Sequence, residues 1–214
     1  MKPDYSLYLV TNSGMTGREQ LADTVAQAVR GGVTVVQYRE KTASTATMIR
    51  EAGAILKLLR GTSIPLIIND RVDVALAAGA DGVHLGHSDM DPVTARRIMG
   101  TEAIIGYSVE SWQDLDDAEQ LNVDYYGVSP IFATPTKTDT GKPWGIDGMR
   151  KLRELTRRPL VAIGGMNKDT IPDTLMAGAD GVAVVSAICA SENPLASTRE
   201  LHRIISETKN NHTA

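Results

Sequence analysis

Eight short apolar runs alternate with amphipathic stretches along the whole of this chain. Such alternation predicts parallel strands joined by helical crossovers, and runs nearly free of polar residues predict strands buried on both faces. We expect strands at 7–10, 33–38, 66–68, 82–85, 103–106, 125–128, 160–163 and 181–184, and helices at about 18–30, 45–59, 71–78, 91–99, 111–121, 147–156, 168–177 and 194–208. Eight such units predict an α/β fold, a single (β/α)8 TIM barrel, with a doubly wound open sheet as the alternative.

An internal repeat supports closure of the barrel. The segment LAAGADGV at 76–83 recurs as LMAGADGV at 175–182. The two copies join the third helix to the fourth strand and the seventh helix to the eighth strand, half a barrel apart. Helices lead into strands on this face, so we interpret Asp81 and Asp180 as structural residues. We expect one barrel domain over 1–208 and a frayed C-terminal tail over 209–214.

The composition argues against several classes of partner. The formal net charge is −4, with acidic and basic residues mixed, and no basic patch indicates nucleic-acid binding. The apolar runs are too short for a membrane span, and no secretory apolar segment follows Met1. The single cysteine, Cys189, fits a reducing compartment. We expect a cytoplasmic protein that acts on small molecules, without a nucleic-acid or membrane partner, and leave open whether it forms a homo-oligomer.

Polar residues collect directly after the predicted strands, where the active sites of (β/α)8 barrels lie. The second strand runs into QYREK at 37–41, and alternation places Gln37, Arg39 and Lys41 on one side of the chain. Further polar residues follow the third, fourth and fifth strands: Asn69, Asp70, Asp89 and Ser108. The sequence therefore predicts a polar site at the mouth of the barrel.

Asp70 and Asp89 predict a magnesium site within that mouth. They follow neighbouring strands, so their carboxylates can meet. Two carboxylates, with waters and phosphate oxygens as further ligands, are how proteins usually hold magnesium. The alternative for each aspartate is a helix N-cap. His84 and His87 lack a third nitrogen or sulfur ligand at zinc spacing, so we interpret both as packing or hydrogen-bonding residues.

A second set of phosphate-binding groups follows the last three strands. Gly165 ends a Gly-Gly pair after the seventh strand and Ser186 follows the eighth, the usual phosphate position of such barrels. The loop YGVSPIFATPTKTDTGK at 126–142 contributes four threonines and two lysines, whose hydroxyls and ammoniums bind phosphate. Two phosphate-binding sets and one metal suggest a transferase that joins two phosphorylated substrates, with pyrophosphate as a leaving group.

Taken in this order, the motifs resemble those of the thiamine phosphate synthase family over nearly the whole chain. The resemblance rests on QYREK at 37–41, ND at 69–70, VHLG at 83–86 followed by Asp89, GYSV at 106–109, TPTK at 134–137, IGG at 163–165 and VS at 185–186. It implies a Mg2+-dependent transferase that moves a hydroxymethylpyrimidine group from its diphosphate to the nitrogen of 4-methyl-5-(2-phosphooxyethyl)thiazole. The products are thiamine phosphate and pyrophosphate, and the mechanism is dissociative.

The resemblance also implies a role for each motif residue. The pyrimidine diphosphate is bound by Gln37, Tyr38, Arg39, Glu40, Lys41, Asn69, Ser108 and Lys137, of which Arg39, Lys41, Ser108 and Lys137 are catalytic. The thiazole phosphate is bound by Thr134, Thr136, Gly165, Val185 and Ser186, and magnesium by Asp70 and Asp89. Such chemistry needs no strong base or nucleophile, because neutralising the leaving group and orienting two reactants suffice.

The chain departs from the family pattern at three positions. Glu110, Ser129 and Ala133 stand where the family often carries His, Gly and Pro. We expect Glu110 to face solvent in the helix that follows the fifth strand. These departures concern the fine-tuning of substrate binding more than the type of reaction.

Three other functions compete with the synthase. A thiazole tautomerase on the same barrel would not need Asn69, Asp70, Asp89 and Lys137 together. A non-catalytic sensor of thiamine phosphates would keep the binding residues, and only turnover separates it from an enzyme. A sugar-phosphate isomerase would need a Glu or His base at a strand end, and none is well placed apart from His84 and His87.

Overall fold

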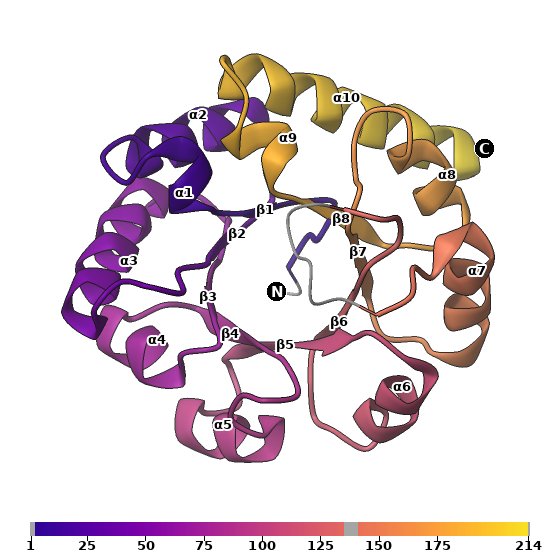
Figure 1. The fold of residues 1–214 in the computed structure, drawn as a ribbon, viewed down its shortest axis with the longest axis horizontal. Coiled ribbons are helices and arrows are strands. Elements are labelled where there is room, and N and C mark those ends of the chain that lie inside the picture. The colour runs from indigo at the N-terminus through magenta and orange to yellow at the C-terminus, as the bar shows by residue number, and fades with distance from the viewer. Residues whose placement is uncertain (1–2, 135–140, 214) are drawn as a thin grey trace.

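The computed structural model describes residues 3–134 and 141–213, in which eight parallel strands close into a barrel (Figure 1). Each strand pairs with the next one along the chain, and β8 pairs with β1. The strands are β1 Leu7–Val10, β2 Val35–Tyr38, β3 Leu66–Asn69, β4 Gly82–Leu85, β5 Ile104–Val109, β6 Tyr125–Val128, β7 Leu160–Ile163 and β8 Gly181–Val184. The predicted (β/α)8 barrel is confirmed, and the open-sheet alternative is wrong.

Helices form a ring outside the strands (Figure 1). They are α1 Ser13–Thr16, α2 Leu21–Gly31, α3 Thr45–Leu59, α4 Val72–Ala78, α5 Pro92–Met99, α6 Trp112–Ala118, α7 Gly145–Leu155, α8 Ile171–Met176, α9 Ser186–Cys189 and α10 Pro194–Thr213. The sequence did not predict α1 and α9, because four residues are too few to show a helical period.

Burial on both faces explains why the strands are apolar. Every residue of β1, β2, β3, β6 and β8 is buried. One apolar cluster fills the barrel interior and includes Tyr5, Tyr8, Ile67, Tyr125 and Val161. A larger cluster lies between the strands and the surrounding helices. Because apolar clusters cover both faces of the strands, polar side chains can gather only at the strand ends.

The aspartates of the internal repeat, Asp81 and Asp180, stabilise the end of the barrel where the strands begin. The carboxylate of Asp81 accepts a hydrogen bond from the backbone N–H of Leu66, the first residue of β3, at 2.8 Å. Asp180 does the same for Leu160, the first residue of β7, at 2.7 Å. Each aspartate therefore holds the start of the preceding strand, as its structural interpretation requires.

The C-terminal segment needs a correction. It was expected to fray after residue 208, but α10 continues to Thr213. The Lys209 ammonium donates to the hydroxyl of Ser6 and to the carbonyl of Asp180, each at 2.6 Å. These contacts tie the last turns of α10 to the N-terminal face of the barrel. Within the described residues, no helix is both long and apolar enough to cross a membrane.

Candidate active site

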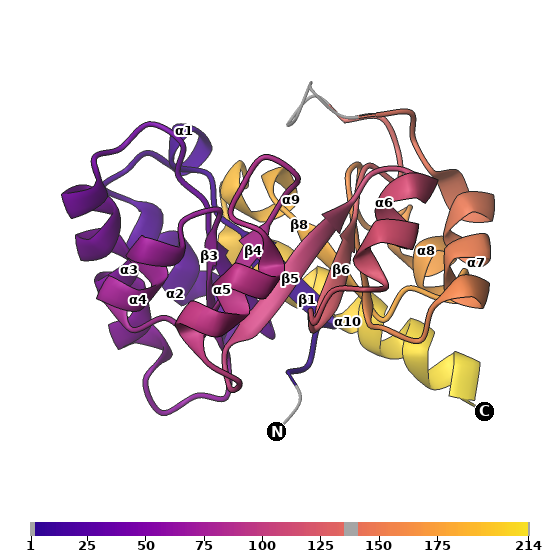
Figure 2. The ribbon, with the colours of Figure 1, turned by 90° about the horizontal axis from the view of Figure 1, so that it is seen from below.

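A pocket of about 760 Å³ opens at the carboxyl ends of the strands. Figure 2 shows the loops that follow the strands at the upper end of the barrel and both termini at the lower end. The predicted site residues that line the pocket are Gln37, Arg39, Lys41, Asn69, Asp70, Asp89, Ser108, Thr134, Gly165, Val185 and Ser186. Residues from seven strands and their loops thus meet at one mouth, although they are scattered over the sequence.

Among the described residues predicted to bind the pyrimidine diphosphate, two do not line the pocket. Tyr38 is fully buried on the outer side of β2, where its hydroxyl donates to Glu51 at 2.6 Å. Glu40 also turns away, and its side chain is only 3% exposed. The reason is the alternation of side chains along an extended chain, which sends Arg39 and Lys41 inward and the residues beside them outward.

Glu40 instead ties the loop after β2 to the N-terminal helices. One carboxylate oxygen accepts hydrogen bonds from Thr42 N, Thr42 Oγ1 and Ala43 N. The other accepts from Ser13 Oγ at 2.7 Å and from the guanidinium of Arg18 at 2.9 Å. Burial alone would raise the pKa of Glu40, but the hydrogen bonds from Ser13, Thr42 and Ala43 outweigh it and lower the pKa to about 2. This residue therefore shapes the segment that carries Arg39 and Lys41.

Asp70 and Asp89 come together at the mouth, as predicted. The Lys41 ammonium donates to Asp70 at 2.5 Å, and Asp89 accepts from the backbone N–H of Gly86 at 2.7 Å. Burial raises the pKa of Asp89 above its ordinary value, and the adjacent carboxylate of Asp70 raises it further. Neither aspartate is a helix cap, because Asp91 caps α5 and α4 has no side-chain cap.

This pair fits a magnesium ion that draws its remaining ligands from elsewhere. Two adjacent carboxylates repel one another, and a divalent cation between them would remove that repulsion. Among the described residues, no group of three or more His, Cys, Asp or Glu side chains could hold a metal. The protein would thus supply two oxygen ligands, and waters and phosphate oxygens would complete the shell. The backbone of Asp70 has a left-handed conformation, with φ of 64°. Such a conformation costs a non-glycine residue about 1–3 kcal/mol.

Asn69 adds an unsatisfied donor to the same wall. Asn69 is 7% exposed, and its Nδ2 has no hydrogen-bond partner within the described part of the chain. Burying an amide without a partner is unfavourable, so such groups usually await a ligand or water. Because Asn69 lies next to Asp70 and lines the pocket, a ligand oxygen would satisfy it.

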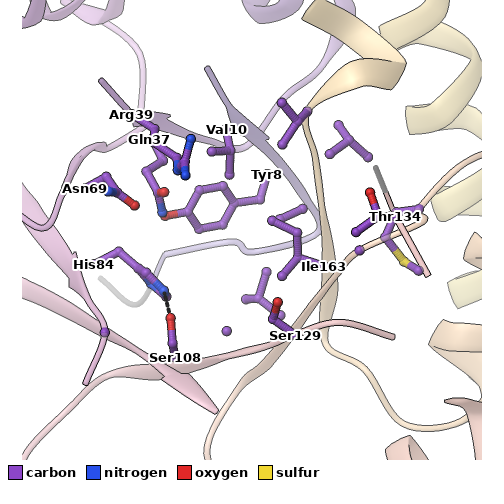
Figure 3. Close-up of a pocket in the computed structure, with 18 of the residues that line it drawn as sticks. Tyr8, Val10, Gln37, Arg39, Asn69, His84, Ser108, Ser129, Thr134 and Ile163 are labelled. Carbon is purple, nitrogen blue, oxygen red and sulfur yellow. Dashed lines mark hydrogen bonds between the residues drawn. The ribbon is translucent and has the colours of Figure 1, made fainter. Parts of the chain in front are cut away.

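The loops after β6 and β7 build the opposite wall. Backbone hydrogen bonds join Ile131 N to Ile163 O at 2.9 Å and Phe132 N to Gly164 O at 3.1 Å. Gly165 has a φ of 70°, and a Cβ there would lie 2.8 Å from Phe132 Cβ, so only glycine fits. Figure 3 shows Thr134 on this wall, across the pocket from Asn69 and His84. The predicted ligands Thr136 and Lys137 lie outside the described residues.

Several residues that the sequence did not assign to the site also line the pocket, and among them are four with ionisable side chains near its floor or rim. Tyr8, His84, Tyr125 and Glu110 all line the pocket. The two tyrosines looked like core residues of strands, although a buried phenol needs a hydrogen-bond partner and so signals a polar floor. His84, expected only to pack or hydrogen-bond, does the latter to Tyr125 and Ser108, at 3.0 Å each. From the sequence we expect Glu110 to face solvent, but it precedes α6, is half-buried and lines the pocket.

His87 is held beside the same mouth. Its Nε2 lies 3.0 Å from the carboxylate of Asp114, and its ring lies 5.6 Å from that of Tyr107. Asp114 is the reciprocal partner of Ser111 in the capping box that begins α6. Ser111 caps α6, and His87 is a hydrogen-bonding residue as interpreted.

Comparison with known proteins places the chain within one family. The family model described as thiamine monophosphate synthase matches residues 7–188. A thiamine-phosphate synthase from Albidiferax ferrireducens is 54% identical, with 93% of this chain and 91% of that protein aligned. One from Vibrio campbellii is 50% identical over 92% of this chain and 96% of its own. The solved structure of a thiamine phosphate pyrophosphorylase from Pyrococcus furiosus superimposes with a TM-score of 0.88, at 36% identity, covering 96% of this chain and 98% of that one.

The extent of these matches agrees with the layout of the site. The family model begins with β1 and ends in α9, so it spans every strand that contributes to the pocket. The relatives align over nearly their whole length, which leaves no large part of them without a counterpart here. The chain belongs to the thiamine monophosphate synthase family and is a transferase.

Proposed function

We propose that the pocket transfers a hydroxymethylpyrimidine group from its diphosphate to the nitrogen of a thiazole phosphate, giving thiamine phosphate and pyrophosphate. One observation carries this proposal. In a chain 54% identical to a thiamine-phosphate synthase, a single pocket joins a cationic wall holding two carboxylates to a second wall of glycine and hydroxyl groups. The two walls suit two different phosphorylated substrates.

The cationic wall would receive the diphosphate. Arg39 and Lys41 line it, and both can neutralise the negative charge that builds up on departing pyrophosphate. Asp70 and Asp89 would hold magnesium, which, when bound, supplies further neutralisation of the leaving group. The Nδ2 of Asn69, which has no partner among the residues that the structure describes, would donate to a substrate oxygen nearby.

The opposite wall would hold the thiazole phosphate. The hydroxyls of Thr134 and Ser186 and the backbone beside Gly165 line it, and all are groups that bind a phosphate monoester without adding a base to the site. The lysine at 137 and the threonine at 136 follow Thr134 in the same loop and would complete the two subsites.

The bonds change in an order that needs no protein nucleophile. The bond between the methylene carbon and the diphosphate oxygen breaks, and its electron pair leaves with pyrophosphate. The electron-rich aminopyrimidine carries the resulting positive charge until the thiazole nitrogen forms the new C–N bond with its lone pair. The protein's task is to orient the two reactants and stabilise the leaving group.

A turnover assay tests this function. The purified protein is mixed with the pyrimidine diphosphate, the thiazole phosphate and Mg2+, with an EDTA control, and pyrophosphate and thiamine phosphate are followed together. We expect equal release of both products, and none in EDTA. A folded protein that binds either phosphate but releases no product would overturn the synthase and favour a tautomerase or a sensor.

A further inference from the structure

A chain of hydrogen bonds runs along the floor of the pocket from β2 to β5. Gln37 Nε2 donates to the Tyr8 hydroxyl at 2.9 Å, and that hydroxyl lies 2.7 Å from the hydroxyl of Tyr125. The Tyr125 hydroxyl is 3.0 Å from His84 Nδ1, and His84 Nε2 is 3.0 Å from Ser108 Oγ. Figure 3 shows Tyr8 reaching Gln37 at one end and the His84–Ser108 bond at the other. We call these five residues the relay.

Packing fixes the rings of the relay in place. Tyr8 and Tyr125 are each only 1% exposed. A Cβ at Gly106 would lie 2.2 Å from the Tyr125 ring, and one at Gly127 would lie 2.7 Å from His84 Cε1. Glycines on β5 and β6 thus make room for the two rings that pass the hydrogen bonds along. Such rings cannot swing to other partners without disturbing the barrel core.

The direction of the relay follows from counting protons. Burial raises the pKa of Tyr8 and of Tyr125, so both phenols stay protonated and each has one proton to give. Tyr8 accepts from Gln37, so its own proton goes to Tyr125, and the proton of Tyr125 goes to His84 Nδ1. His84 must then carry its proton on Nε2 and donate it to Ser108.

We propose that Tyr8, Tyr125 and His84 are positioning residues that fix the hydrogen-bonding polarity of the pocket. At one end, Gln37 donates one N–H of its Nε2 to Tyr8, which orients the amide and leaves its Oε1 as an acceptor. At the other end, Ser108 accepts from His84 and offers its own proton as a donor. One acceptor and one donor complement an amino-substituted nitrogen heterocycle, whose amino group donates and whose ring nitrogen accepts.

The reversed relay would select a different ligand. If every hydrogen bond were reversed, the Gln37 amide would be turned over so that its Oε1 accepted from Tyr8. Gln37 would then present an N–H to the ligand, and Ser108 would present a lone pair. That arrangement complements an oxo-substituted ring, whose carbonyl accepts and whose ring N–H donates. The relay therefore discriminates between an aminopyrimidine diphosphate and its oxo analogue. The identity of these two ligands rests on the proposed function, whereas the direction of the relay does not.

Nitrogen NMR on the ligand-free protein tests the direction independently of turnover. The ring nitrogens are labelled with ¹⁵N, and the His84 signals are assigned by comparison with His84→Gln. We expect the Nε2–H tautomer of neutral His84, and finding the Nδ1–H tautomer would overturn the proposal. In Tyr125→Phe, which removes the donor to Nδ1, we expect the fixed tautomer to be lost.

Substrate discrimination tests the consequence. We expect Tyr125→Phe to lower the ratio of kcat/KM for the amino substrate over the oxo analogue by roughly tenfold or more, with the KM for the thiazole phosphate unchanged. Tyr5→Phe is the matched control, because its ring lies 4.7 Å from that of Tyr125 but its buried hydroxyl has no partner among the described residues. An unchanged ratio in Tyr125→Phe, or an equal fall in Tyr5→Phe, would refute the positioning role.

Two further outcomes are informative. If Tyr125→Phe does not fold, Tyr8→Phe breaks the relay one step earlier and should lower the same ratio; an unchanged ratio in that variant would again refute the role. If the wild-type protein turns over neither pyrimidine diphosphate, the proposed function fails, while the His84 tautomer still decides the direction of the relay.

Discussion

Glu40 offers a quantitative test of how the loop after β2 is held. In the folded protein five donor groups from four residues surround its carboxylate, and its side chain is 3% exposed. The pKa falls from an ordinary 4.5 to about 2. A difference of about 2.5 pH units corresponds to a stabilisation on the order of 3 kcal/mol. We expect Glu40→Gln to lower the free energy of unfolding at pH 7 by about 2–3 kcal/mol and Tm by roughly 5–10 °C.

The dependence on pH has a definite sign. The carboxyl group is harder to protonate in the folded protein than in the unfolded chain, so its stabilisation is complete above pH 4.5 and is lost as the pH falls toward 2. The difference in unfolding free energy between wild type and Glu40→Gln should therefore shrink over this range. Urea unfolding followed by circular dichroism, repeated at pH 7 and at steps below 4.5, measures it.

A surface glutamate provides the control. Glu207 pairs with Arg203 one turn away on α10, and the two side chains are 57% and 60% exposed. Such pairs contribute little, so Glu207→Gln should change the free energy of unfolding by at most about 0.5 kcal/mol. If Glu40→Gln were as mild as this control at pH 7, or if its effect did not vary with pH, the account of the Glu40 cluster would be refuted.

Other substitutions test the two walls of the pocket. Asp70→Asn combined with Asp89→Asn should abolish activity together with its dependence on magnesium, and a fully active double variant would end the metal assignment. Ser186→Ala should raise the KM for the thiazole phosphate several-fold more than that for the pyrimidine diphosphate, whereas the reverse pattern would mean that the two subsites are exchanged. Lys137→Ala should cut kcat at least tenfold with little change in Tm, and unchanged turnover would remove Lys137 from the site.

The barrel was predictable because its pattern is repeated and local. Five of the eight strands, for example Leu7–Val10 and Leu160–Ile163, begin and end where the apolar runs do. The rule that chemistry follows the strands also located polar residues on both walls of the pocket, among them Arg39, Asp70 and Ser186. A structural role for Asp81 and Asp180 was predictable, because both recur at the same place in a repeat, where a helix leads into a strand. The backbone groups that they bind were not predictable from the sequence.

Side-chain direction was harder to predict. Tyr38 and Glu40 belong to the motif at 37–41, in which only every second residue lines the pocket. A resemblance to the whole motif does not show which of its residues face the pocket and which face the helices. The tyrosines of the relay read as apolar strand residues, since their partners come from strands far away in the sequence. Glu110 depends on where β5 ends, three residues later than its apolar pattern suggested.

A structure of the product complex would test the central claim, that the two phosphorylated substrates occupy opposite walls of one pocket. Crystals would be grown with pyrophosphate, thiamine phosphate and Mg2+. We predict pyrophosphate against Arg39 and Lys41, the metal between Asp70 and Asp89, and the phosphate of thiamine phosphate beside Gly165 and Ser186. Pyrophosphate on the Gly165 wall, or a metal bound away from both aspartates, would contradict the account.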